Sequence, residues 1–225
     1  IKYVIDSGLI KQIEYDPRSG VEVLVTKKHS KSGCIQRTGR AGRVSPGECW
    51  RLYTEKDFED REEFHKPEIM RSNLSHVVLT MKKIGIEDVR SFEFIDPPDP
   101  EILEDAVNTL KELGALDENE HLTHIGELMA ELPLEPHVAR MVIESEKYKC
   151  TNAVCTIAAF LGSRSVFVRP KGYEFQADEK HQNFKIPGSD FLTLLNIWKQ
   201  YEANNFSYTW ARNNFLNPQV LEEAR

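Results

Sequence analysis

The residues best suited to chemistry lie in one octamer, QRTGRAGR at positions 36–43. On a helix, spacings of i, i+4 and i+7 place Gln36, Arg40 and Arg43 on one face, so two guanidinium groups and one amide project together. Arginine stays charged, binds phosphate oxygens through paired hydrogen bonds, and can neutralise charge that develops on a phosphoryl group during its transfer. The octamer therefore predicts a phosphate-binding face.

The two glycines of the octamer, Gly39 and Gly42, remove side-chain bulk from its other side. Because glycine inside a helix costs roughly 0.5 to 1 kcal/mol relative to alanine, we expect the backbone to pack closely against a neighbour there. The competing interpretation is a basic solvated loop, which would be favoured for an arbitrary arginine-rich octamer. The strand, hairpin and serine-rich loop before this octamer and the strand after it favour the phosphate-binding interpretation.

The segments around the octamer predict strands. Apolar runs at 3–5 and 21–25 are separated by residues 16–20, DPRSG, in which proline and glycine are typical of a hairpin turn. A further short strand is expected in CWRLYT at 49–54. We expect an α/β segment in which the octamer follows a hairpin and leads into a strand.

The pattern becomes helical after Pro67. One helix is expected there and a second over 101–113, where Gly114 would end it. Leu116 and Leu122 are joined by polar residues, a pattern that predicts a small hairpin or wing. The two helices and this wing together predict a winged-helix domain. The apolar residues expected to face inward are Ile69, Leu74, Val77, Val78, Met81 and Ile84 in the first helix, and Ile102, Ala106, Val107, Leu110 and Leu113 in the second.

Beyond Pro136 we expect further helices at 138–145, 151–161 and 190–201, with Thr151 as an N-cap. On the last helix, Trp198 and Tyr201 could offer bases a stacking platform. The simpler interpretation is a core face. That face consists of Phe191, Leu194, Leu195 and Trp198.

Charge is distributed unevenly over the 225 residues, whose formal net charge is -7. Residues 1–51 hold ten basic and five acidic side chains, whereas residues 87–131 hold two basic and fourteen acidic ones. The remaining C-terminal part, 132–225, is nearly neutral. Such a distribution is typical of separate modules, and it allows a phosphate-binding N-terminal part within an acidic chain.

Several classes of protein are excluded by composition. No apolar run approaches the roughly 18 residues of a membrane span, and no signal peptide opens the chain. The four cysteines lack CxxC spacing, and the seven histidines, including His121 and His124, lack accompanying ligands, so we expect no metal site and an intracellular protein with free thiols. The strand-like start at Ile1 indicates a portion of a longer protein.

The octamer resembles motif VI of superfamily 2 helicases, and its extension QRTGRAGRVSPGECWRLYTEKDF resembles the DEAH-box RNA helicases in particular. Other segments follow in the order of that family and extend the resemblance over essentially the whole chain. They are YVIDSGLIKQIEYDPRSG, PEIMRSNLSHVVLTMKKIGI, DPPDPEILEDAVNTLKELGAL, LTHIGELMAELPLEP, SVFVRP and FLTLLNIWKQY.

The resemblance implies an α/β RecA-like partial domain followed by mainly α-helical winged-helix and ratchet domains. Residues 1–65 would form the C-terminal part of the second RecA-like domain, 66–130 the winged-helix domain, and 131–225 a ratchet domain that is incomplete. The hairpin from about Lys11 to Lys28 would bridge the RecA-like and C-terminal domains and help to separate strands.

The resemblance also implies roles for individual residues. Gln36 would reach the γ-phosphate or the attacking water, and Arg40 and Arg43 would act as arginine fingers at an ATP site shared with a first RecA-like domain. Arg37 and Gly39 would contribute to nucleotide binding. Single-stranded RNA would contact the ratchet domain; the candidates are Arg164, Arg169 and, at the hairpin tip, Arg18, with ordinary surface charge as the alternative for each.

The chain departs from the family pattern at several positions. Gly33 and Cys34 replace a common Ser-Ala pair, Asp190-Phe191 replaces Asp-His, and Trp210-Ala211 replaces Trp-Cys. Neither a GxxxxGK[ST] phosphate loop nor a DEAH tetrad occurs, so the ligands of Mg²⁺ would lie outside this chain. We expect the chain by itself not to hydrolyse ATP.

The resulting hypothesis is the C-terminal part of an ATP-dependent DEAH-box RNA helicase that translocates 3′ to 5′ and remodels RNA or ribonucleoprotein. It would be monomeric, nuclear or nucleolar, and act in splicing or ribosome biogenesis. The acidic stretch from Glu87 to Glu131 could dock a basic protein activator, although a solvated face is the more common interpretation of such a stretch. The alternative is a non-catalytic RNA- or protein-binding module. A DNA-directed winged-helix factor is disfavoured because the expected wing and its helix are acidic.

Overall fold

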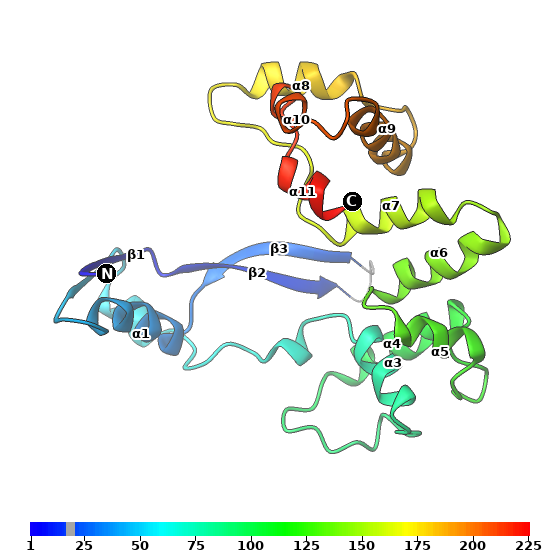
Figure 1. The fold of residues 1–225 in the computed structure, drawn as a ribbon. Helices are drawn as coiled ribbons and strands as arrows, with labels where there is room; N and C mark the ends of the chain where they lie inside the picture. The colour runs from blue at the N-terminus through cyan, green and yellow to red at the C-terminus, as the bar shows by residue number, and fades with distance from the viewer. Residues whose placement is uncertain (17–20) are drawn as a thin grey trace. The chain divides into compact units, whose positions relative to one another are not determined.

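A computed structural model describes residues 1–16 and 21–225, which divide into two compact units, 1–123 and 124–225. The first unit begins with strands and ends with helices, and the second is helical apart from one isolated β-bridge. Figure 1 follows the chain from strand β1 in blue to helix α11 in red. The expected order, an α/β segment followed by mainly helical domains, is found; the RecA-like assignment and the domain boundaries stay predictions.

Two small sheets form the start of the first unit. Strand β1 (Tyr3–Asp6) pairs in parallel with β4 (Glu48–Arg51), and β2 (Leu9–Asp16) pairs with β3 (Val21–Lys28) in an antiparallel hairpin. The strands that lead into the predicted hairpin turn are therefore present, while residues 17–20, including Arg18, lie outside the described part of the chain. Figure 1 shows β2 and β3 as the longest strand pair.

A helical crossover joins the two parallel strands. Helix α1 (Lys31–Gly39) continues into the 3₁₀ turn η1 (Arg40–Gly42), and the chain then enters β4. Parallel strands require such a crossover because the chain must return to the end of the sheet at which the first strand begins. A short helix, α2 (Glu55–Glu59), follows β4; the sequence pattern did not indicate it.

The parallel sheet has two different faces. The register pairs Tyr3 with Glu48 and Ile5 with Trp50, so these side chains share one face. On that face Tyr3, Ile5 and Trp50 are exposed, as are Ile1 and Leu52, which continue the same alternation. The opposite face carries the buried Asp6 and lies against α1. This short sheet is therefore covered on one side only by the described residues.

The second half of the first unit contains the 3₁₀ turn η2 (Glu68–Met70) and helices α3 (Ser75–Lys83) and α4 (Pro100–Glu112). Asp99 caps α4, Gly114 ends it with a φ of 71°, and a β-bridge joins Leu116 to Leu122, as expected of the wing. The prediction of a single helix after Pro67 is wrong, because non-helical residues separate η2 from α3. Val77 and Ile84, both expected inside, are exposed, and Leu79 is buried instead.

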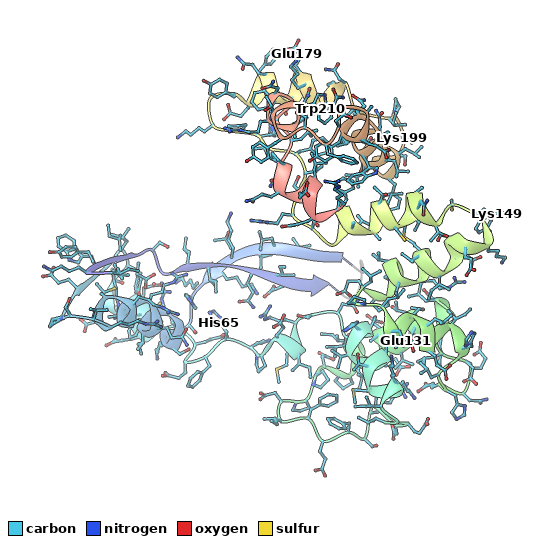
Figure 2. The ribbon with its side chains drawn as sticks, in the orientation of Figure 1. His65, Glu131, Lys149, Glu179, Lys199 and Trp210 are labelled. Carbon is cyan, nitrogen blue, oxygen red and sulfur yellow. The ribbon has the colours of Figure 1, made fainter. Side chains whose placement is uncertain are left out.

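The second unit is helical and contains an aromatic core. The helices are α5 (His124–Glu131), α6 (Pro136–Lys147), α7 (Thr151–Leu161), α8 (Glu174–Gln182), α9 (Asp190–Ala203), α10 (Tyr208–Asn213) and α11 (Pro218–Glu223). Helices α7, α9, α10 and α11 contribute to the core. Phe184, Ile197 and Tyr201 lie at its centre, and Trp210, labelled in Figure 2, has its ring centroid 5.8 Å from that of Phe184 and 6.1 Å from that of Tyr201.

Two details of the second unit correct the expectations from sequence. The N-cap of α7 is Cys150, which makes no side-chain capping bond, and Thr151 instead lies 3.2 Å from the Ser145 hydroxyl. On α9 the buried stripe is Thr193, Ile197 and Tyr201, at intervals of four, whereas Phe191 is exposed. The helix is therefore rotated relative to the face that the sequence suggested.

Candidate phosphate-binding site and RNA-binding residues

The start of α1 is fixed by capping. Ser30 has an extended backbone, and its hydroxyl accepts a hydrogen bond of 3.2 Å from the Gly33 N–H, as a serine N-cap does. The Ser30 N–H itself donates to Nε2 of His65 at 3.2 Å. The helix that carries the octamer therefore begins at a well-defined residue.

The outward side of this helix carries Gln36, Arg40 and Arg43, all of them exposed. Gln36 and Arg40 are aligned by the helical i, i+4 spacing. Arg40 and Arg43 remain aligned because side chains three residues apart eclipse in the 3₁₀ turn that follows. None of the three side chains forms a hydrogen bond or ion pair with any described residue, so two arginines and an amide lie free beside each other.

Arg37, the next residue after Gln36, points inward. Its Nη1 donates to Oδ1 of Asp6 at 2.7 Å, and its Nη2 donates to the carbonyl oxygen of Leu9 at 2.8 Å. Arg37 follows the buried Gly33 by four residues and precedes the buried Ala41 by four, which places it on the inner stripe of the helix. The octamer thus has one inner arginine, Arg37, that is hydrogen-bonded within the chain. The side chains of its two outer arginines, Arg40 and Arg43, form no such bond with the described residues.

Asp6 is the centre of this inner contact. Its side chain is fully buried, and it accepts hydrogen bonds from Arg37, from the Gly8 N–H at 2.9 Å, and from the Tyr53 hydroxyl at 2.8 Å. Burial alone would raise the pKa of Asp6, but the bonds from Arg37, Gly8 and Tyr53 outweigh it and lower the pKa to about 2. The carboxylate is therefore ionised at neutral pH and fully hydrogen-bonded.

Arg61 forms a second buried centre next to the first. Its Nη1 donates to the carbonyl oxygens of Gly8 at 2.6 Å and His29 at 3.0 Å, and its Nε donates to Asp57 at 3.1 Å. The guanidinium also stacks on the ring of Tyr53, 4.1 Å from its centroid. Sequence reasoning missed Asp6, Tyr53 and Arg61. The only available signal was a charged residue at the end of an apolar strand, directly before a Ser-Gly turn.

The glycines of the octamer do not behave as expected. A methyl group at Gly39 or Gly42 would meet no described atom within 4 Å, so the expected close packing is not found among the described residues. Gly33 is the confined one, because a Cβ there would lie 1.8 Å from the imidazole of His29. That ring is held in turn by His65, labelled in Figure 2, whose Nε2 lies 2.5 Å from Nδ1 of His29. Burial, followed by Arg37, lowers the pKa of His29.

The RNA-binding candidates fall into different surroundings. Arg164 is exposed, and its side chain makes no hydrogen bond or ion pair with the described residues. Arg169 is exposed but donates to Asp178 at 2.7 Å. Arg169 also lines a cavity of about 290 Å³ with Phe167, His181 and Lys185. Arg18 lies outside the described residues.

The aromatic pair on α9 belongs to the core. Tyr201 is buried, and the ring of Trp198 packs 6.1 Å from it and 6.2 Å from Phe160. The described residues contain no group of three or more histidine, cysteine or acidic side chains placed to hold a metal ion. In the same part of the chain, no helix is long and apolar enough to cross a bilayer.

Acidic residues of the winged-helix part are partly engaged in ion pairs. Arg90 binds Glu104 at 2.9 Å and Glu120 at 2.7 Å, and Lys111 also contacts Glu120. These bonds, that of Arg90 above all, lower the pKa of Glu120 to about 2. Most of the other acidic side chains in this part of the chain are exposed to solvent.

Comparison with known families gives matches over residues 106–194. Residues 106–134 match the helicase associated domain (HA2), winged-helix, and residues 135–194 match the helicase associated domain (HA2), ratchet-like. These two domains together are characteristic of DEAH-box RNA helicases. The two matches support the interpretation of this chain as a C-terminal portion of such a helicase. The resemblance to the DEAH-box RNA helicases that the sequence shows is thereby confirmed at the level of the family.

Proposed function

We propose that this chain supplies one half of an ATP site and the RNA-holding domains of an ATP-dependent RNA helicase. The observation that carries the proposal is the outward face of α1, where Gln36, Arg40 and Arg43 lie aligned, exposed and without partners among the described residues. Leaving two arginines free beside each other is unfavourable unless an anion joins them, because like charges at this spacing repel.

The residues fit a phosphate group in their chemistry. Two guanidinium groups would bind the terminal phosphate of ATP and stabilise the charge that develops as it is transferred, while the Gln36 amide would orient the attacking water. Bound ATP would supply the phosphoryl group and Mg²⁺ its charge neutralisation, with the metal ligands in another part of the protein. In this proposal Gly39 contributes only space for the approach of the nucleotide.

The first 65 residues are proposed to be part of a RecA-like domain. The parallel pairing of β1 with β4 through α1 supports this assignment, since helical crossovers between parallel strands build such domains. The exposed apolar face of Tyr3, Ile5 and Trp50 gives further support, because parallel sheets are normally covered on both faces.

Single-stranded RNA is the proposed polymer substrate, held by the ratchet domain and moved 3′ to 5′ as ATP is consumed. The free Arg164 and the cavity that joins Phe167 to Arg169 and Lys185 support this part of the proposal. Cations next to an aromatic ring are the combination with which proteins bind the backbone and bases of single strands. A protein activator on the acidic winged-helix part completes the proposal.

The proposal is tested in the intact enzyme that contains this chain. Arg40→Ala and Arg43→Ala are expected to lower RNA-stimulated ATP turnover by about 10³-fold or more, as loss of an arginine finger does, while the affinity for RNA stays within about twofold. Arg51→Ala serves as the matched control, since Arg51 is also exposed in this region but stacks on Phe58. Normal turnover in both variants would overturn the proposal.

The alternative, a non-catalytic RNA- or protein-binding module, predicts a different result from the same experiment. Arg40→Ala and Arg43→Ala would then weaken binding of RNA, with a smaller dependence on salt, because each would remove a phosphate contact. The unpartnered face of α1 favours the ATP site. The observation that favours the module is the chain's lack of a phosphate loop of its own.

A further inference from the structure

Arg37 is the arginine of the octamer that the outward face does not include. We propose that Arg37 is a positioning residue: its contacts with Asp6 and Leu9 lock the octamer helix to the base of the β2–β3 hairpin, so that a shift of the hairpin displaces Gln36 and Arg40. This inference rests on the proposed function and deepens it, because it assigns a coupling between the strand-contacting hairpin and the ATP site.

Two of the five N–H donors of Arg37 are engaged within the chain. Nη1 donates to a buried carboxylate and Nη2 donates to a backbone carbonyl, so both terminal nitrogens of the guanidinium are held in place. Releasing Arg37 would leave Asp6 charged and buried with one partner fewer, which is costly in a protein interior. The guanidinium is therefore part of the scaffold of the site and not one of its ligands.

The base of the hairpin is fastened to the helix at two points. The first is the bond from Arg37 to the carbonyl oxygen of Leu9, the first residue of β2. The second is Gly8, whose carbonyl oxygen accepts from the His29 N–H at 2.8 Å and from Arg61 at 2.6 Å. His29 immediately precedes the N-cap of α1, so both ends of the helix are tied to residues 8 and 9.

Gly8 explains why this junction is rigid. Its φ of 70° is readily adopted only by glycine, and a Cβ there would lie 2.5 Å from Nη2 of Arg61 and 2.6 Å from the Tyr53 ring. The chain therefore turns from β1 into β2 directly against the contacts of Arg61 and Arg37. A displacement of β2 at Leu9 would have to move Arg37 or break its bond.

Transmission from Arg37 to the phosphate-binding face requires no further contact. Gln36 is its neighbour in sequence, and Arg40 lies three residues further along the same hydrogen-bonded helix, where the Arg40 N–H donates to the Arg37 carbonyl. Displacements of about 1 Å at a reacting group can reduce rates about 100-fold. A small movement of the inner arginine is thus sufficient to switch the outer ones between effective and ineffective positions.

The test compares Arg37→Lys and Asp6→Asn in the intact enzyme, with Arg51→Lys as the control. Lysine keeps the charge but lacks the planar fork that reaches Asp6 and the Leu9 carbonyl from two separate nitrogens. We expect both variants to lower RNA-stimulated kcat by about 10- to 100-fold with KM for ATP changed less than about twofold, as loss of positioning without loss of binding requires. The double variant should be no worse than the more severe single variant, since the two residues act as one unit.

A second readout reports the coupling directly. The number of ATP molecules consumed per duplex unwound should rise in Arg37→Lys and Asp6→Asn, because hydrolysis continues while the hairpin no longer follows it. Tyr53→Phe, which removes one of three bonds to Asp6 and keeps the ring, should shift the same quantities in the same direction by a smaller factor. It gives a result even if the other variants fold poorly.

Two outcomes would overturn the inference. The first is a higher KM for ATP in Arg37→Lys together with an unchanged KM for ATP in Asp6→Asn. This result would indicate that Arg37 is a phosphate ligand. The second is additive losses in the double variant, which would make the residues independent. Arg40→Ala separates this failure from failure of the proposed function: if Arg40→Ala is inactive, the ATP site stands and only the positioning role is lost.

Discussion

The octamer region and the second unit are stabilised by opposite means. Around α1, charged groups occupy the interior: Asp6 is buried and binds Arg37, and the buried Arg61 binds the carbonyl oxygen of Gly8. The apolar side chains Tyr3, Ile5 and Trp50 of the β1–β4 sheet are exposed. In residues 124–225, aromatic and aliphatic side chains fill a closed core, and charged groups lie at the surface. The second unit is therefore held together by apolar burial, whereas the octamer region places a few charged groups by hydrogen bonds.

The largest effect is expected in the closed core. Phe184→Ala should lower the free energy of unfolding of the second unit by about 3–5 kcal/mol, because the side chain is fully buried and the cavity left behind cannot collapse. Phe175→Ala is the control, since that side chain is 82% exposed on α8 and should change stability by less than about 0.5 kcal/mol. Urea unfolding followed by circular dichroism measures both, and equal effects would contradict the closed core.

The next effect is a pH dependence of the octamer region. The pKa of Asp6 is about 2 in the folded chain and 3.8 without these contacts, so its stabilising contribution is complete above pH 3.8 and is lost as the pH falls through about 2. Amide hydrogen exchange of α1, compared between pH 5 and pH 3 after correction for the intrinsic rate, should show the start of this loss.

Asp6→Asn should cost about 1–3 kcal/mol at neutral pH, as expected for a buried partner of a charged hydrogen bond. It should also remove the pH dependence of exchange in α1. Exchange in α9 of the second unit serves as the internal control, since the core there contains no carboxylate. A pH dependence that persists in Asp6→Asn would assign it to another group.

Two glycine substitutions distinguish the inner and outer sides of the same helix. Gly33→Ala should destabilise the octamer region because its Cβ would overlap the His29 ring, which His65 holds in place. Gly39→Ala should be neutral or stabilising by up to about 1 kcal/mol, since its φ of -62° is helical and nothing described lies near it. Thermal melting of the chain checks both.

A double substitution sharpens this test. His29→Ala removes the obstructing ring, so Gly33→Ala should cost less in that background than in the parent chain. If the cost is unchanged, the confinement of Gly33 has another origin. If Gly39→Ala is the more damaging of the two single variants, the assignment of inner and outer sides is wrong.

The smallest effect concerns RNA. Arg164→Ala should reduce the slope of log affinity for single-stranded RNA against log salt concentration by about 0.7, the value for one phosphate contact on a single strand. Arg169→Ala should reduce it less, because Arg169 must first be released from Asp178. Binding titrations at several salt concentrations measure both slopes, and an unchanged slope in Arg164→Ala would remove it from the RNA-binding candidates.

Sequence patterns predicted the fold where they depended on local periodicity. Helix α4, its glycine terminus and the wing bridge at Leu116 follow from spacing alone, as does the outward alignment of Gln36 and Arg40. The rotation of α9 was missed because Thr193 is polar by type, yet its hydroxyl bonds internally to Ile186 and Ser189 and so can be buried.

The inner half of the candidate site was not predictable for a different reason. Asp6, Arg37, Tyr53 and Arg61 are far apart in sequence, and only the parallel return of the chain through α1 brings them together. A charge inside a protein is disfavoured unless it is paired, so composition predicts such residues at the surface. The proposed positioning role of Arg37 therefore rests on its contacts in the structure.

The division of the octamer into an inner and an outer side is tested most directly by single-turnover ATP cleavage in the intact enzyme, with ATP and RNA saturating. We expect Arg40→Ala to slow the cleavage step about 10³-fold or more, and Arg37→Lys to slow it only about 10- to 100-fold with nucleotide affinity retained. Cleavage at the normal rate in Arg40→Ala, or loss of nucleotide binding in Arg37→Lys, would contradict the account.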